Sequence, residues 1–169
     1  MSTWLTESEF RQSGARATGV TINVAFLQDI KEDNVQFKEV LSRTAIELSD
    51  NTSPDPRTAV DVLIGLQDEL ETHFALEEFF GYFQNARLSN PSIGRKAEAV
   101  RNEHQKLFLQ LNEIVDLAEQ VLYRECNYET TMDNVIQGFD QFLHALESHE
   151  TREAELMMQL YNEEIGVGD

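Results

Sequence analysis

Cysteine and basic residues are scarce in this chain, and each shortage excludes a class of protein. The single cysteine, Cys126, cannot form an internal disulfide, so the chain is not a disulfide-stapled scaffold. Thirteen Lys and Arg stand against 31 Asp and Glu, which gives a formal net charge of −18. Because such a surface repels phosphate backbones and anionic lipid head groups, nucleic acid and membrane surfaces are poor partners for this acidic protein.

Long apolar runs are missing as well. No stretch approaches the roughly 20 apolar residues that a membrane-spanning helix needs, and residues 1–19 are too polar to form a signal peptide. With the lack of disulfides, these features favour a location in the cytoplasm. Nucleophile arrangements of Ser, Cys or Lys and phosphate-binding glycine loops are also absent, so nothing in the sequence predicts an enzyme.

Only three prolines and eight glycines interrupt the chain, and they fall where the helical periodicity of apolar residues stops. The pattern predicts four long amphipathic helices, over about residues 20–48, 57–86, 93–124 and 127–161. No alternation of period two competes with them. The length suits one domain. We expect a polar N-terminal extension over residues 1–18, a four-helix bundle over 19–163 and a tail over 164–169.

Four helices of similar length joined by short connections pack most easily as an up-down-up-down bundle. Residues of two antiparallel neighbours lie at the same level when their midpoint in the sequence falls in the connecting loop. The pairs His73–His104 and His104–His149 satisfy this condition. Asn34, the polar residue in the middle of the first helix's apolar stripe, satisfies it with His73. One polar residue from each helix is therefore predicted to lie in a common layer.

Two glutamates extend this layer, because Glu77 and Glu153 follow His73 and His149 by one helical turn. A buried carboxylate is costly without a positive partner, and imidazole with carboxylate suits iron, manganese or zinc. We therefore predict a metal site made by His73, Glu77, His104, His149 and Glu153. Two alternatives remain open: a metal-free interaction module whose polar layer is a hydrogen-bonded core network, and a mononuclear zinc or manganese site.

Three motifs around these residues match the signatures of one family. His73-Phe74-Ala75-Leu76-Glu77-Glu78 is similar to a His-Phe-x-x-Glu-Glu motif, Glu103-His104-Gln105-Lys106-Leu107 to Glu-His-x-x-Leu, and the segment from His149 to Glu153 to His-x-x-x-Glu. The chain thus resembles the hemerythrin-like, or HHE cation-binding, domain family over about residues 20–161. The resemblance implies that the three histidines are terminal iron ligands, and that the two glutamates bridge or chelate a non-haem di-iron centre.

The chain also departs from that family. Asn34 stands where the first helix of the family usually supplies a histidine, so Asn34 is a further candidate ligand, although an amide oxygen binds metal weakly. The chain has only four histidines, and His144 lies off the inward stripe, where we expect it at the surface. A reversible oxygen carrier is not expected. Either one metal of an asymmetric pair is completed by water, or a single metal binds.

We therefore expect a small non-haem iron-binding bundle that senses or handles iron, oxygen or nitric oxide, or redox state. A small diatomic ligand is the partner that this function implies. The sequence does not identify a protein partner. Three nearby carboxylates are given lesser roles. Glu78 and Glu103 either support the ligands from behind or are solvated, and we favour the solvated interpretation. Asp33 could turn toward the site if Asn34 does not coordinate, but its direction on the helix lies about 100° away from that of Asn34.

Overall fold

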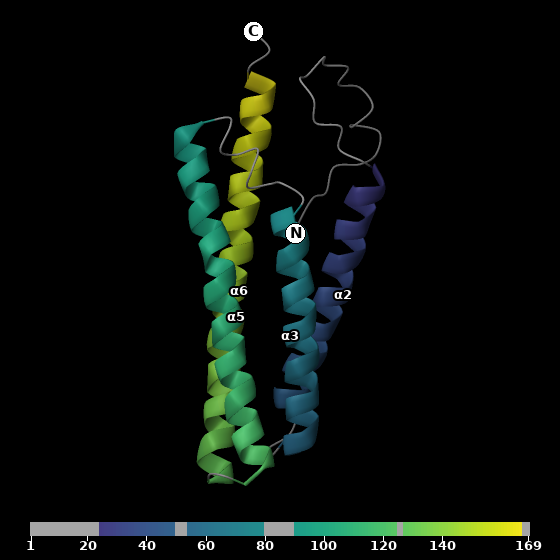
Figure 1. Ribbon diagram of the computed structural model, residues 1–169, viewed down its shortest axis with the longest axis vertical. Helices are drawn as coiled ribbons and strands as arrows, with labels where there is room; N and C mark the ends of the chain where they lie inside the picture. The colour runs from purple at the N-terminus through teal and green to yellow at the C-terminus, as the bar shows by residue number, and fades with distance from the viewer. Residues whose placement is uncertain (1–23, 50–53, 80–89, 125–126, 167–169) are drawn as a thin grey trace.

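The computed structural model describes residues 24–49, 54–79, 90–124 and 127–166. Over these residues the chain forms four α-helices and no strand: α2 (Val24–Ser49), α3 (Pro56–Phe79), α5 (Pro91–Leu122) and α6 (Tyr128–Gly166). Their long axes run in roughly the same direction (Figure 1). The predicted all-α helical bundle is thus confirmed.

The observed helix bounds agree closely with the predicted ones where both can be compared. Helix α5 begins and ends within two residues of the prediction, and α6 continues to Gly166, five residues beyond the predicted end. The predicted helical residues 20–23 and 80–86 lie outside the described part of the chain. Within the described ranges, no helix is both long enough and apolar enough to cross a membrane.

Polar side chains start three of the helices. Asp55 Oδ2 accepts a hydrogen bond from the backbone N–H of Thr58 at 2.9 Å, and Asn90 Oδ1 accepts one from that of Ser92 at 2.8 Å. Asn127 caps the first turn of α6 in the same way. Each cap satisfies a backbone donor that the helix itself leaves unpaired, and a proline follows directly in α3 and α5. These caps explain why the helices begin where the polar connections end.

One end of the bundle is tied together by a hydrogen bond between two connecting segments. The Tyr128 hydroxyl, at the start of α6, donates to the carbonyl oxygen of Pro54, just before α3, at 2.8 Å. At the same end, Arg124 follows α5 with φ 58°, the left-handed conformation that commonly terminates a helix. The end of α5 and the start of α6 therefore lie beside the start of α3.

Packing contacts join α2 to α3, α3 to α5 and α5 to α6, and bury two apolar clusters. The main cluster fills most of the bundle and includes Phe37, Leu63, Leu66, Leu70, Leu111, Val135, Phe139, Phe142 and Leu146. A smaller cluster joins the beginning of α5 to the later part of α6 and consists of Ile93, Ala97, Val100 and Leu156. The level between the two clusters carries the polar residues.

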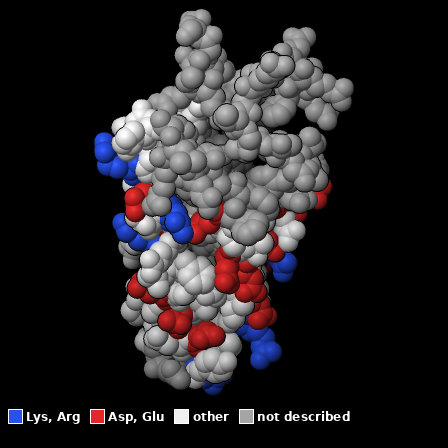
Figure 2. All heavy atoms as spheres, turned by 45° about the horizontal axis from the view of Figure 1, so that its top comes forward, with Lys and Arg blue, Asp and Glu red and all other residues white. Residues whose placement is uncertain are grey.

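The described surface is strongly acidic. In the view of Figure 2, Asp and Glu side chains are spread over much of the described surface, with Lys and Arg side chains at its margins. Like charges of this number repel one another across the surface. The helices are therefore held together chiefly by the apolar clusters and by the polar layer between them.

Candidate metal centre

The five residues predicted as metal ligands come from three helices and lie at one level of the bundle. Helix α3 carries His73 and Glu77, α5 carries His104, and α6 carries His149 and Glu153. Four of them are buried with at most 7 % of their surface exposed, and Glu153 is partly buried. On α5 and α6 the two clusters lie on either side of this level, with Val100 before His104 and Leu107 after it.

The Glu77 carboxylate lies at the centre of the group. Its Oε1 is 2.9 Å from His73 Nε2, and its Oε2 is 3.3 Å from His104 Nε2. The rings of His104 and His149 meet edge to face with centroids 4.8 Å apart. One ligand atom each from Glu77, His104 and His149 fall within 4.8 Å of one another. Glu153 is hydrogen-bonded to Glu77 and is close enough to His73 for their charges to interact.

Glu77 thus stands between two sets of donors. His104 lies at one of its oxygens, with His149 against the His104 ring, while His73 lies at the other oxygen and interacts with Glu153. A carboxylate can use its two oxygens for two different cations. The arrangement can accordingly hold one ion against His104 and His149, and it has the donors for a second ion against His73 and Glu153.

Each of the three buried histidine rings also bonds a carboxylate at its other nitrogen. The Nδ1 atom of His73 is 2.9 Å from Asp33 Oδ2, that of His104 is 3.1 Å from Glu78 Oε1, and that of His149 is 3.0 Å from Glu103 Oε2. We call Asp33, Glu78 and Glu103 the outer carboxylates. Since an ionised carboxylate only accepts hydrogen bonds, Nδ1 is the donor, and in a neutral ring the lone pair of Nε2 is left for the interior.

The outer carboxylates correct the expectation that Glu78 and Glu103 are merely solvated. Their side chains are only 35 % and 23 % exposed, and each also pairs with an arginine. Arg101 donates to Glu78 Oε2 at 3.2 Å, and Arg152 donates to Glu103 Oε2 at 3.0 Å. The expectation was wrong because each glutamate points away from the apolar stripe of its own helix. The ring that it bonds lies on the next helix: His104 for Glu78 and His149 for Glu103.

Two phenylalanines hold the planes of the rings. Phe37 stacks on His73 with centroids 4.6 Å apart and planes 7° apart, and Phe74 stacks on His104 at 4.1 Å and 6°. Phe74 also meets the ring of His149 edge to face at 5.7 Å. The polar layer is therefore lined by aromatic carbon, which limits the access of water to it.

Burial and neighbouring charge move the pKa values of this cluster. Burial alone would lower the pKa of His73, but the hydrogen bond and charge of Glu77, followed by those of Asp33, raise it to about 9. Burial, with the charge of Glu77 added, raises the pKa of Glu153 to about 8. Burial lowers the pKa of His104 below its usual value. Near pH 7 and without a metal, protons are therefore held on His73 and Glu153, while His104 is neutral.

The acidic character of one outer carboxylate is reinforced by its cationic neighbours. Burial opposes ionisation of Glu103, yet hydrogen bonds from Arg152 and His149 hold its pKa below the usual range. Glu103 is thus an anion at neutral pH and accepts a hydrogen bond from Nδ1–H of His149.

The outcome for the remaining candidates is mixed. On α2, Asp33 contacts the site by a hydrogen bond to His73, although Asp33 and Asn34 point in different directions from the helix. Asn34 is partly buried, and its role as a further ligand stays a prediction. His144 is exposed, as predicted. The sequence did hold a signal for the outer carboxylates, since Asp33, Glu78 and Glu103 each adjoin a residue predicted to face inward.

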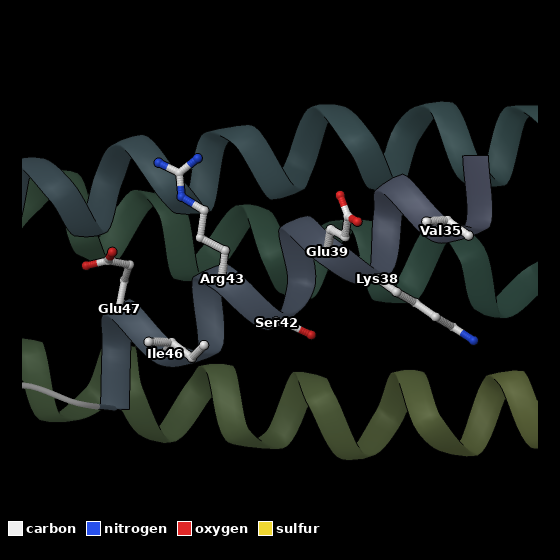
Figure 3. A pocket seen from close by; sticks show the side chains of 7 residues that line it. All are labelled: Val35, Lys38, Glu39, Ser42, Arg43, Ile46 and Glu47. Carbon is white, nitrogen blue, oxygen red and sulfur yellow. The ribbon is translucent and has the colours of Figure 1, made fainter. Parts of the chain in front are cut away.

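The structure also has a shallow surface hollow, which is a separate feature. It has a volume of about 580 Å³ and is lined by seven residues of α2: Val35, Lys38, Glu39, Ser42, Arg43, Ile46 and Glu47. Figure 3 shows their side chains spread along the outer side of that helix, with charged groups of both signs. The buried histidines and glutamates do not line this hollow. It contributes nothing to the candidate metal centre.

Comparison of the chain with protein-family models, curated proteins and solved structures finds no match. The case for a metal therefore depends on the donor set itself. His149 Nε2 is buried and, among the described residues, makes no hydrogen bond. A buried lone pair beside a carboxylate and a second imidazole is an unfavourable arrangement without a cation, and a transition-metal ion satisfies all three groups. The residues present fit such an ion.

Proposed function

We propose that this chain is a hemerythrin-like, non-haem iron-binding protein with a di-iron site in the core of an up-down-up-down bundle. Its role is to sense or handle iron, oxygen or nitric oxide, or redox state. The observation that carries the proposal is the placement of Glu77, whose two oxygens face different histidines while His149 and Glu153 supply one further donor to each side. Imidazole and carboxylate donors on facing helices are the usual ligands of di-iron bundles.

The bundle topology is part of this proposal. Each helix packs against the next one along the chain, and the hydrogen bond from Tyr128 to Pro54 joins two of the connections at one end. In Figure 1 the colour runs down α5 and back up α6. These features support helices that alternate in direction, as short connections require.

The ligand roles follow from the same contacts. His104, His149 and one oxygen of Glu77 would hold one iron, while His73, Glu153 and the other oxygen of Glu77 would hold the second. Bound iron would supply a Lewis acid with two accessible oxidation states, which suits binding of a diatomic molecule or a response to redox state. The chain itself supplies the fixed imidazoles, the carboxylates and the aromatic lining that limits water.

Metal content of the purified protein tests the proposal. Protein without an affinity tag, prepared without chelators, is expected to contain iron and to show charge-transfer absorption. His149→Ala is expected to reduce bound iron by at least tenfold, because it removes an imidazole that no neighbour replaces. The matched control is His144→Ala on the same helix, which should leave the iron content unchanged. Equal iron loss in both variants, or no metal in the wild-type chain, would contradict the proposal.

A second candidate function is a metal-free helical interaction module. One observation favours it: the polar layer is already internally paired at several points, with His73 between Asp33 and Glu77, His104 bonded to Glu78, and His149 bonded to Glu103. Buried networks of this kind can fix the register of helices without a metal. The two functions differ in the effect of a chelator, which lowers the melting temperature of a metal-holding bundle and leaves that of a metal-free bundle unchanged.

A further inference from the structure

We propose that the outer carboxylates, Asp33, Glu78 and Glu103, are positioning residues that direct Nε2 of each histidine, with its lone pair, toward the metal. This inference rests on the proposed metal site and deepens it. Three observations carry it: the three Nδ1 contacts of 2.9 to 3.1 Å, the stacked phenylalanines, and the order of the helices from which the carboxylates come.

Stacking alone cannot fix the orientation of the His73 and His104 rings. A phenylalanine that stacks on an imidazole at 6° or 7° fixes the plane of the ring, but a half-turn about the Cβ–Cγ bond leaves that plane unchanged. The half-turn exchanges the position of Nδ1 with that of a ring carbon. A polar partner at Nδ1 distinguishes the two orientations, and in all three rings the outer carboxylate is that partner.

The contact also selects the tautomer. Because a carboxylate accepts and cannot donate, the proton of a neutral ring stays on Nδ1, and Nε2 keeps the lone pair that a metal needs. Glu103 satisfies this requirement most clearly, since Arg152 donates a hydrogen bond at 3.0 Å to the same oxygen that contacts His149 Nδ1. In the neutral His149 ring the bond to Glu103 thus places the lone pair on Nε2, which is buried.

The three contacts form an ordered series along the bundle. Asp33 of α2 bonds a ring on α3, Glu78 of α3 bonds a ring on α5, and Glu103 of α5 bonds a ring on α6. Two members of the series are anchored further by Arg101 and Arg152, whose side chains are about half exposed. Each helix thus orients the metal ligand of the next helix, and the arginines hold the carboxylates from the solvent side.

The experiment uses the full chain with ¹⁵N-labelled histidine, first without metal at pH 8. Two-bond ¹H–¹⁵N spectra report whether His149 carries its proton on Nδ1 or on Nε2. The wild-type chain is expected to show the Nδ1–H form. Glu103→Ala is expected to lose it, whereas Glu103→Gln, whose amide oxygen still accepts a hydrogen bond, is expected to retain it in part.

Cobalt(II) titration then measures the consequence for metal binding. Glu103→Ala is expected to weaken binding by about tenfold to a hundredfold, with Glu103→Gln between it and the wild type. Glu113→Gln, an exposed position on the same helix, is the control and should bind as the wild type does. Circular dichroism of each variant establishes that the helices are intact.

Different results would contradict the positioning role of Glu103 and the proposed metal function. An unchanged Nδ1–H signal of His149 in Glu103→Ala would overturn the positioning role, whatever the metal affinity. If the wild-type chain binds no cobalt or iron while Glu103→Ala still changes the tautomer, the proposed metal function fails and the orientation of the ring by Glu103 stands.

Discussion

At the scale of single residues, the candidate metal centre is a cluster whose protons would compete with a cation. His73 and Glu153 both have pKa values raised above those of the unfolded chain, from 6.5 to about 9 and from 4.5 to about 8. A metal that uses these residues must displace both protons. The same residues that build the site therefore make its affinity depend on pH.

This linkage gives a prediction for the stability of the metal-free chain. Between pH 4.5 and 8 the folded state holds the Glu153 proton that the unfolded state has released, and between pH 6.5 and 9 the same is true of His73. The stability from both groups is thus greatest at low pH and falls as pH rises, most steeply from 6.5 to 8. Urea unfolding in the presence of a chelator, at pH 6 and pH 9, measures it.

The variant Glu153→Gln isolates one contribution. The amide can donate to Glu77 but does not titrate, so the loss of stability between pH 6 and 9 should be smaller than in the wild type. Cobalt affinity of the wild type should change in the opposite sense and increase with pH over the same range. An identical pH dependence of unfolding in both chains would refute the assigned pKa of Glu153.

At the scale of the helix, two glycines within helices, Gly65 and Gly138, meet different surroundings. A Cβ added at Gly65 of α3 meets no atom within 4 Å, whereas one added at Gly138 of α6 lies 3.2 Å from Ile114 Cγ1 of α5. Gly138 thus permits a close approach of α5 and α6, while Gly65 weakens its helix without evident gain in packing.

We therefore expect Gly65→Ala to raise the free energy of unfolding by about 0.5–1 kcal/mol, the usual difference between glycine and alanine inside a helix. Gly138→Ala is the matched comparison and should give a smaller gain, because the Ile114 side chain must move. Chemical unfolding of the two variants measures the difference. A Gly138→Ala chain as stable as Gly65→Ala would show that α5 and α6 do not need the glycine.

Helix scale is also where the sequence was most informative. The apolar periodicity and the capping residues predicted α5 to within two residues, because both signals are local. The level of the polar layer was predictable from the midpoints of the connections, which brought His73, His104 and His149 together. The partners of Glu78 and Glu103 could not be read in this way, since they depend on the rotation of one helix against another.

At the scale of the whole molecule, the polar layer divides the core into two parts. The main cluster lies on one side of it, and the small cluster around Ile93 and Leu156 lies on the other. A cation held by residues of α3, α5 and α6 cross-links three helices at this level. Metal loading is therefore expected to stabilise the fold as a whole.

A ligand that binds only the folded state at 100 times its dissociation constant stabilises that state by about 2.7 kcal/mol. For a chain of this size the melting temperature should rise by roughly 5–10 °C on anaerobic addition of iron(II). Differential scanning calorimetry measures the change, and His149→Ala should reduce it while His144→Ala should not. A melting temperature that iron leaves unaltered in the wild type would contradict the cross-linking role.

The direction of the carboxylate series has a consequence for synthesis. Asp33, Glu78 and Glu103 each precede, in the chain, the histidine that they bond. On the ribosome each outer carboxylate therefore emerges earlier than the imidazole that it bonds at Nδ1. Assembly of the ligand geometry can thus proceed stepwise from the amino to the carboxyl end, with the last helix completing it.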